Sequence, residues 1–196
     1  MARTPAVSWI EYTAAAILLI SVVLSALENI WSWPTAIAGV ALYIIVFYQA
    51  KLYADMGLQV VYIAISVYGW YEWLHGGEAA GVLQVSKVPM RVLLIGTIIA
   101  LAATAALGLF FRHYTDAALP FADSALTSFS LLAQFMMARK YLENWYLWIL
   151  VDVFYIAMFI FKHLYPTAVL YAAFIGACTL GFVQWRKAIT PVAQRV

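Results

Sequence analysis

The sequence predicts an all-α integral membrane protein with seven transmembrane helices, arranged as two parallel three-helix bundles joined by a linker helix. The first observation is composition: of 196 residues, 66% are hydrophobic and only 10% are charged. A water-soluble domain of this size needs far more charge to cover its surface. The second observation is an internal repeat, in which a pattern of residues recurs 112 positions later in the chain.

Seven apolar segments are candidate spanning helices, each of which needs about 20 residues to cross a bilayer. They are expected at 9–27, 33–50, 56–74, 90–111, 123–138, 145–161 and 166–185. Pro34, Pro89 and Pro166 lie at or near helix starts, where a missing N–H costs little. The fifth segment is the shortest and most polar, so its hydroxyl and amide side chains are expected to face other helices.

The repeat predicts how the helices are grouped. Its seven identities are Trp33/Trp145, Tyr43/Tyr155, Phe47/Phe159, Leu52/Leu164, Tyr53/Tyr165, Gly69/Gly181 and Trp73/Trp185. So many identities at one offset indicate duplication. Since three is odd, one linker helix lets both halves run in the same direction. The expected division is 1–75, 76–117 and 118–196. Repeat halves form an interface near the bilayer midplane where a small solute can bind and cross, which indicates a transporter.

Aromatic and basic residues indicate depth and orientation. Tryptophan and tyrosine gather at the segment ends, where we expect most of them to anchor the helices in the headgroup region. With seven spans, the Lys and Arg residues divide seven to four between the two sides. The richer side is expected to be cytoplasmic, which places the C-terminus in the cytoplasm and the N-terminus in the periplasm.

Asp152 is the most informative polar residue within the apolar segments. Burying a carboxylate in hydrocarbon costs several kcal/mol, so its side chain is expected to face the bundle interior or a wet cavity. Trp148 lies four residues earlier on the same helix face, and Tyr155 follows three residues later. An indole beside a carboxylate suits a flat, cationic aromatic ligand. The alternative is a structural acid bonded to a neighbouring hydroxyl or glutamine. The matching position in the first half is Val40, so the acid comes from one half alone.

Two further polar residues have competing interpretations. Gln59, four residues into the third segment, suits either solute binding or a hydrogen bond between helices. Glu72 lies near a helix end, where we expect it to reach the interface or to form an ion pair.

Several classes of function are excluded by what the sequence lacks. His75, His113 and His163 lie in separate loops and no HExxH pattern occurs, so no metal site is expected. There is no GxSxG and no phosphate-binding glycine loop, so we expect neither an enzyme nor a cofactor. No basic run indicates nucleic-acid binding. The seventh segment has no lysine for a retinal Schiff base, and the single Cys178 forms no intrachain disulfide.

Three blocks of the sequence resemble the PnuC family of vitamin transporters. They are 52–59, 67–73 and, most specifically, 139–148 with the pattern RK-x-x-ENW-x-x-W. The resemblance implies a bacterial inner-membrane importer of nicotinamide riboside, working by facilitated diffusion with alternating access. It also implies a fold like that of full-length SWEETs, a homotrimer, and trapping of the vitamin by a cytoplasmic kinase. Relatives called PnuT and RibM carry thiamine and riboflavin.

The resemblance also extends to the binding residues. Gln59, Asn144, Trp148 and Asp152 fall in the substrate-binding blocks of the family. With the neighbouring aromatic side chains, the candidate substrate-binding set is Trp33, Gln59, Asn144, Trp145, Trp148, Asp152 and Tyr155. Nicotinamide riboside importers carry an amide where this chain has Asp152, so thiamine, which is also flat and cationic, is the alternative substrate. An alternative of another class is a membrane binding or assembly protein that transports nothing.

Overall fold

The computed structural model describes residues 9–49, 53–78, 81–115, 119–161 and 165–189. These residues form seven α-helices, which confirms the predicted helix number and fold class. They are α1 (Trp9–Ala26), α2 (Ser32–Gln49), α3 (Tyr53–His75), α4 (Met90–Tyr114), α5 (Pro120–Ala138), α6 (Asn144–Phe161) and α7 (Tyr165–Ile189). The β-type pairing found among the described residues is a single bridge between Ser86 and Tyr141.

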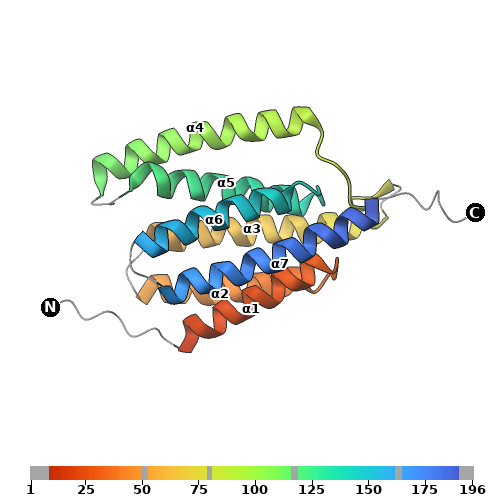
Figure 1. Ribbon diagram of the computed structural model, residues 1–196, viewed down its shortest axis with the longest axis horizontal. Coiled ribbons are helices and arrows are strands. Elements are labelled where there is room, and N and C mark those ends of the chain that lie inside the picture. The colour runs from red at the N-terminus through yellow and green to blue at the C-terminus, as the bar shows by residue number, and fades with distance from the viewer. Residues whose placement is uncertain (1–8, 50–52, 79–80, 116–118, 162–164, 190–196) are drawn as a thin grey trace, which may run out of the picture.

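The helices pack mainly against their neighbours in sequence (Figure 1). In the first half α1 contacts α2 and α2 contacts α3, and in the second half α5 contacts α6 and α6 contacts α7. The halves meet where α1 packs on α7 and α3 packs on α5. Helix α4 lies on the outside, against α5. The start of α1 and the end of α7 lie at opposite ends of the bundle, as an odd number of passes requires.

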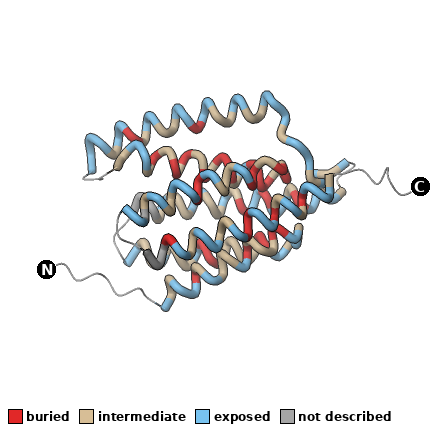
Figure 2. Tube along the Cα trace, viewed as in Figure 1, coloured by how far each residue is buried: buried red, intermediate tan, exposed pale blue. Residues whose placement is uncertain are grey.

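The helices differ in how closely their composition resembles that of a membrane span, and burial accounts for the polar residues of α5. By length and composition, α1, α2, α4 and the 168–189 part of α7 could each cross a membrane, and 144–158 is a shorter apolar helix. Helix α5 has more polar residues, yet nine of its residues are buried, among them Ser124, Ser128 and Ser130. Figure 2 shows much of the buried colour along this helix. The expectation that its polar side chains face other helices is therefore confirmed.

The turns after α1 and after α5 have the same backbone geometry. In each, a residue other than glycine adopts the left-handed conformation, Glu28 with φ 54° and Lys140 with φ 50°. In each, the N–H groups that follow the helix donate back to carbonyls of its last turn, which is the Schellman arrangement. The bonds are Glu28 N to Ser25 O (3.0 Å), Asn29 N to Leu24 O (2.9 Å), Lys140 N to Met137 O (3.0 Å) and Tyr141 N to Met136 O (3.0 Å). We call the end of the bundle that holds both turns the turn end; it lies on the right in Figure 1.

Four tryptophans fill the core at the turn end: Trp33, Trp73, Trp145 and Trp185, each at most 2% exposed. The rings of Trp33 and Trp73 lie 5.3 Å apart, those of Trp145 and Trp185 lie 5.1 Å apart, and those of Trp73 and Trp185 lie 5.9 Å apart. Expecting such residues to be headgroup anchors was wrong for these four.

Two interactions explain why these rings are inside the protein. The ring of Trp33 packs where Gly69 has no side chain, and the ring of Trp145 packs in the same way on Gly181. The indole N–H of Trp73 donates to the Met137 carbonyl (3.2 Å) and that of Trp185 to the Ser25 carbonyl (3.1 Å). Both bonds join one half of the chain to the other, and they occupy matching positions of the repeat.

Candidate functional site

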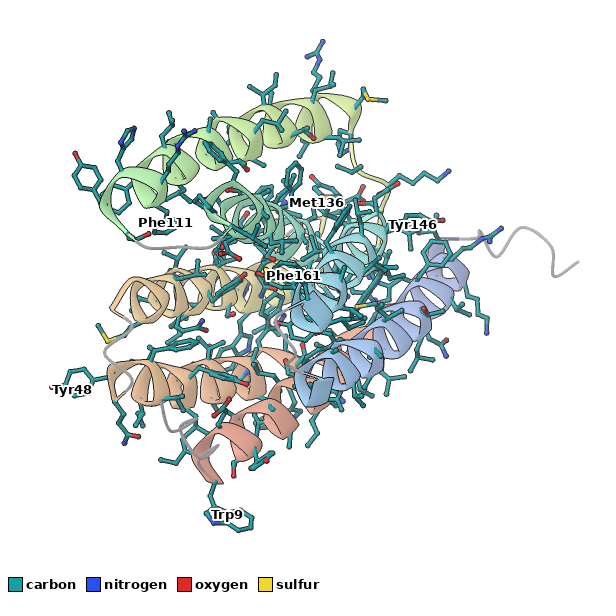
Figure 3. The ribbon with its side chains drawn as sticks, turned by 60° about the vertical axis from the view of Figure 1, so that its left-hand side comes forward. Trp9, Tyr48, Phe111, Met136, Tyr146 and Phe161 are labelled. Atoms are coloured by element: carbon teal, nitrogen blue, oxygen red, sulfur yellow. The ribbon has the colours of Figure 1, made fainter. Side chains whose placement is uncertain are left out.

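One face of α6 carries four of the predicted site residues. Asn144, Trp148, Asp152 and Tyr155 follow one another at intervals of three or four residues, so they lie along one side of the helix. The other side is apolar and exposed. Tyr146 and Phe161, labelled in Figure 3, are on that side and mark the two ends of the helix.

The start of α6 at the turn end fixes Asn144. Its side-chain nitrogen donates to the Tyr141 carbonyl at 2.7 Å, and the residue is fully buried. The side-chain oxygen of Asn144 has no partner among the described residues, and neither does the indole N–H of Trp148 on the next turn. Both atoms are buried polar groups without a partner among the described residues.

Asp152 is only 4% exposed, so the acid faces the bundle interior as expected. Among the described residues, its hydrogen-bond donor is the Cys178 thiol of α7, with Sγ 3.9 Å from Oδ2. A thiol is a weak donor, so this contact compensates little of the cost of burying a carboxylate. The structural alternative predicted a hydroxyl or glutamine partner for Asp152, and the described residues supply the Cys178 thiol instead.

Tyrosines from three other helices gather around this carboxyl group. The ring of Tyr155 lies 5.0 Å from that of Tyr171 on α7. Tyr171 also lies near Asp152, Tyr62 and Tyr43. We call Tyr43, Tyr62, Asp152, Tyr155, Tyr171 and Cys178 the polar cluster. Helices α2, α3, α6 and α7 contribute to it, so both halves of the chain do.

Our sequence reasoning missed most of this cluster. It named Asp152 and Tyr155 and gave no site role to the other four members. One signal was available, because Tyr43 and Tyr155 are an identity of the repeat. Another was the position of Tyr62 three residues after Gln59, which places the two on one face of α3.

The remaining predicted residues lie in two places. Trp33 and Trp145 belong to the four-tryptophan core, so packing is the role that their surroundings show. Gln59 is partly buried on α3. Five of the seven predicted residues thus lie on α6, four of them along one face, and Gln59 shares a helix face with a member of the polar cluster.

Several buried polar atoms, most of them near the turn end, have no partner among the described residues. Among the described residues they are Ser32 Oγ, Trp33 Nε1, Ser128 Oγ, Asn144 Oδ1, Trp145 Nε1 and Trp148 Nε1. Leaving a buried donor or acceptor unsatisfied costs about 1–3 kcal/mol. Ser32 matches Asn144 in the repeat, and Trp33 matches Trp145. Buried polar atoms without a partner among the described residues therefore occur in both halves.

Asp152 and Cys178 of the polar cluster are buried, while its four tyrosines are partly exposed. Two hollows, of about 480 Å³ and 300 Å³, lie beside the start of α6 and share Glu143 and Tyr146 in their linings. Neither is lined by Asp152.

Comparisons with known proteins show what this chain is similar to. The model of a family described as nicotinamide mononucleotide transporter matches residues 8–187. The nicotinamide riboside transporter PnuC of Escherichia coli is 29% identical, over 91% of this chain and 85% of that protein. The riboflavin/roseoflavin transporter RibM of Streptomyces davaonensis is 30% identical, over 74% of this chain and 69% of that protein. A crystal structure of the vitamin B3 transporter PnuC superposes with a TM-score of 0.73 at 25% identity, over 95% of this chain and 83% of that chain. Each of these relatives is named as a transporter and none as an enzyme.

Proposed function

The chain belongs to the nicotinamide mononucleotide transporter family, and from that premise we propose that it imports nicotinamide riboside, with thiamine as the alternative substrate. The family membership and the apolar helices make it a multi-pass membrane transporter of a vitamin. The observation that carries the choice of substrate is Asp152, a buried carboxyl group with a weak partner, on the same face of α6 as Trp148.

The chemistry of this face suits a flat organic cation. The Trp148 ring stacks on the cationic ring, and the Asp152 carboxylate offsets its charge. The unpartnered Asn144 oxygen and Trp148 N–H supply an acceptor and a donor for hydroxyl or amide groups. Nicotinamide riboside and thiamine each carry such a cationic ring. Riboflavin is larger and uncharged, so an acid offers it less.

Transport in this proposal is facilitated diffusion with alternating access. The halves 1–75 and 118–196 rock against each other around the polar cluster, and 76–117 supplies the loop and the linker helix. Rigid repeats that move around a central site are the common mechanism of transporters built this way. The substrate set is Gln59, Asn144, Trp148, Asp152 and Tyr155, with Trp33 and Trp145 behind it.

The cellular setting is proposed from the family resemblance and the charge distribution. The chain lies in the bacterial inner membrane as a homotrimer, with the N-terminus in the periplasm and the C-terminus in the cytoplasm. A cytoplasmic kinase phosphorylates the incoming vitamin and so keeps it inside the cell.

The test is a tryptophan-fluorescence titration of the purified protein with nicotinamide riboside, thiamine and riboflavin. We expect nicotinamide riboside to bind most tightly. The Asp152→Asn variant should bind the two cations less tightly, while Glu78→Gln, which alters an exposed loop acid, should behave as the parent. Uptake into proteoliposomes then separates a transporter from a binding protein. Tighter binding of thiamine would replace the proposed substrate, and binding without uptake would refute transport.

A further inference from the structure

An ion pair joins the two matching turns at the turn end. The Lys140 Nζ lies 2.9 Å from the Glu28 Oε2, and the two residues are 112 positions apart, which is the offset of the repeat. Each half therefore contributes the residue that follows its first helix, and the two side chains meet where the halves meet.

Lys140 is held in surroundings that require a partner. Its side chain is 4% exposed, and its ammonium group lies 4.5 Å from the centre of the Trp73 ring. A buried charge is costly unless it is paired. Glu28, whose side chain is 31% exposed, supplies the negative charge from the opposite half. The pair is thus buried on one side and reaches water on the other.

Both residues hold a backbone conformation that favours glycine. Helix ends of this kind usually carry glycine at the left-handed position, because a side chain there is strained. Such positions persist where the surroundings determine them, and they cluster at switch regions and binding sites. Here each position carries a charged side chain, and the charges are used in the contact between the halves.

We propose that Glu28 and Lys140 form a latch that holds the turn end closed and that opens when solute passes from the polar cluster to that side. The latch rests on the proposed transport function. The four-tryptophan core lies directly behind it and lies between the turn end and Asp152. Glu28 already reaches water. In this proposal the separation of the halves exposes Lys140 as well, so both charges are then hydrated and the contact is reversible. A second ion pair, Arg139 to Glu72 at 2.7 Å, joins α5 to α3 beside it.

The chain contains its own reporter for this opening. Cys178 is the single cysteine, is 3% exposed and contacts Asp152 in the polar cluster. Its rate of reaction with a small, charged methanethiosulfonate reagent therefore measures how often a path to the cluster opens. No substrate is needed for this measurement, so it does not depend on which vitamin is carried.

The first experiment compares the Cys178 labelling rate in the parent, Glu28→Gln and Glu78→Gln. Breaking the latch should raise the labelling rate of Cys178 about fivefold. This is the factor by which the open population grows when a contact contributing about 1 kcal/mol is lost. The loop variant removes the same charge from an exposed site and should label as the parent does. The double exchange Glu28→Lys with Lys140→Glu should bring the rate back toward that of the parent. An unchanged rate in Glu28→Gln, or an exchange that rescues nothing, would overturn the latch.

A cross-link separates a latch from a permanent pivot. Cysteines placed at positions 28 and 140, in a Cys178→Ser background, are joined by a short bismaleimide, and the same protein before cross-linking is the reference. A latch predicts that cross-linking stops nicotinamide riboside uptake but leaves its binding. Continued uptake after complete cross-linking would show a pivot and overturn the proposal. If the parent chain binds and carries no vitamin, the proposed function fails, while the labelling result still decides whether the turn end opens.

Discussion

The beginnings of α2 and α6 have a tryptophan at matching positions and the same backbone geometry in the turn before it. Trp33 and Trp145 each follow a left-handed turn, and each ring packs on a glycine of the next helix, Gly69 or Gly181. Further along the same two helices the halves diverge. Where α6 has Trp148 and Asp152, the matching positions of α2 are Ala36 and Val40.

This difference separates two demands on the chain. At the turn end each half must pack its own helices tightly, and a tryptophan on a glycine of the next helix meets that demand in both halves. In the interior one half supplies an aromatic ring and an acid, while the other supplies small or apolar side chains at the same depth. The flat cation of the proposed function would need one such surface, and a second buried acid would add the cost of another charge.

The largest expected effect on stability comes from disrupting the tryptophan–glycine packing that occurs in both halves. A methyl group at Gly69 or Gly181 would overlap the ring of Trp33 or Trp145, so Gly69→Ala and Gly181→Ala should each destabilise the fold by about 1–3 kcal/mol. Thermal unfolding of the purified protein measures this. Gly176→Ala is the matched control, because its added methyl group meets nothing within 4 Å. Equal melting temperatures for Gly181→Ala and Gly176→Ala would contradict the packing argument.

The next effect comes from giving the second half the residue of the first. Asp152→Val removes the buried carboxylate, and a contact to a charged group contributes about 1.5–3 kcal/mol, so nicotinamide riboside should bind roughly 10–100 times more weakly. The fluorescence titration measures this. The reduced, uncharged form of the same riboside serves as control, since it has no positive charge for the acid to offset. A similar loss for both forms would show that Asp152 acts through packing.

Trp148→Ala, which again copies the first half, should have a smaller effect. Cation–π contacts contribute about 0.5–2 kcal/mol, so the affinity for either cationic vitamin should fall by about 2–30-fold. Trp148→Phe should keep part of the affinity because a ring remains. Trp31→Ala, which removes an exposed ring, should bind as the parent does. Binding by Trp148→Ala at the parent's affinity would remove this residue from the site.

The smallest effect is expected at the ion pair that the first half lacks. Arg139 contacts Glu72 and Tyr68, while the matching residue of the first half is Leu27. The hydrogen bond with Tyr68 is the main cause that raises the pKa of Arg139, so the residue stays charged at any working pH. Because the guanidinium side chain is 34% exposed, Arg139→Leu should cost less than about 1 kcal/mol. Melting curves at low and high salt measure it. A loss as large as that of Gly69→Ala would contradict this expectation.

The sequence alone determined the number and kind of the helices. Apolar segments bounded by charged residues or proline form helices, because a backbone in lipid must satisfy its own hydrogen bonds. Even the polar fifth segment, predicted at 123–138, forms a helix over Pro120–Ala138. The burial of the Asp152 side chain also followed from the sequence, since a carboxylate in an apolar helix has to face inward. The family resemblance rested on local blocks, and the family model confirms it.

Only the tertiary structure decided which side chains meet. Tryptophan tends to lie among lipid headgroups, but this tendency does not decide the position of every ring. Trp33 and Trp145 are buried because a glycine of the neighbouring helix leaves space for each ring. The tyrosines of the polar cluster come from four helices, so no local spacing connects them. Glu28 and Lys140 look like ordinary loop charges in the sequence. They pair because the halves pack so that matching turns face each other, and contacts at a separation of 112 residues are fixed by that packing and not by the residues near them.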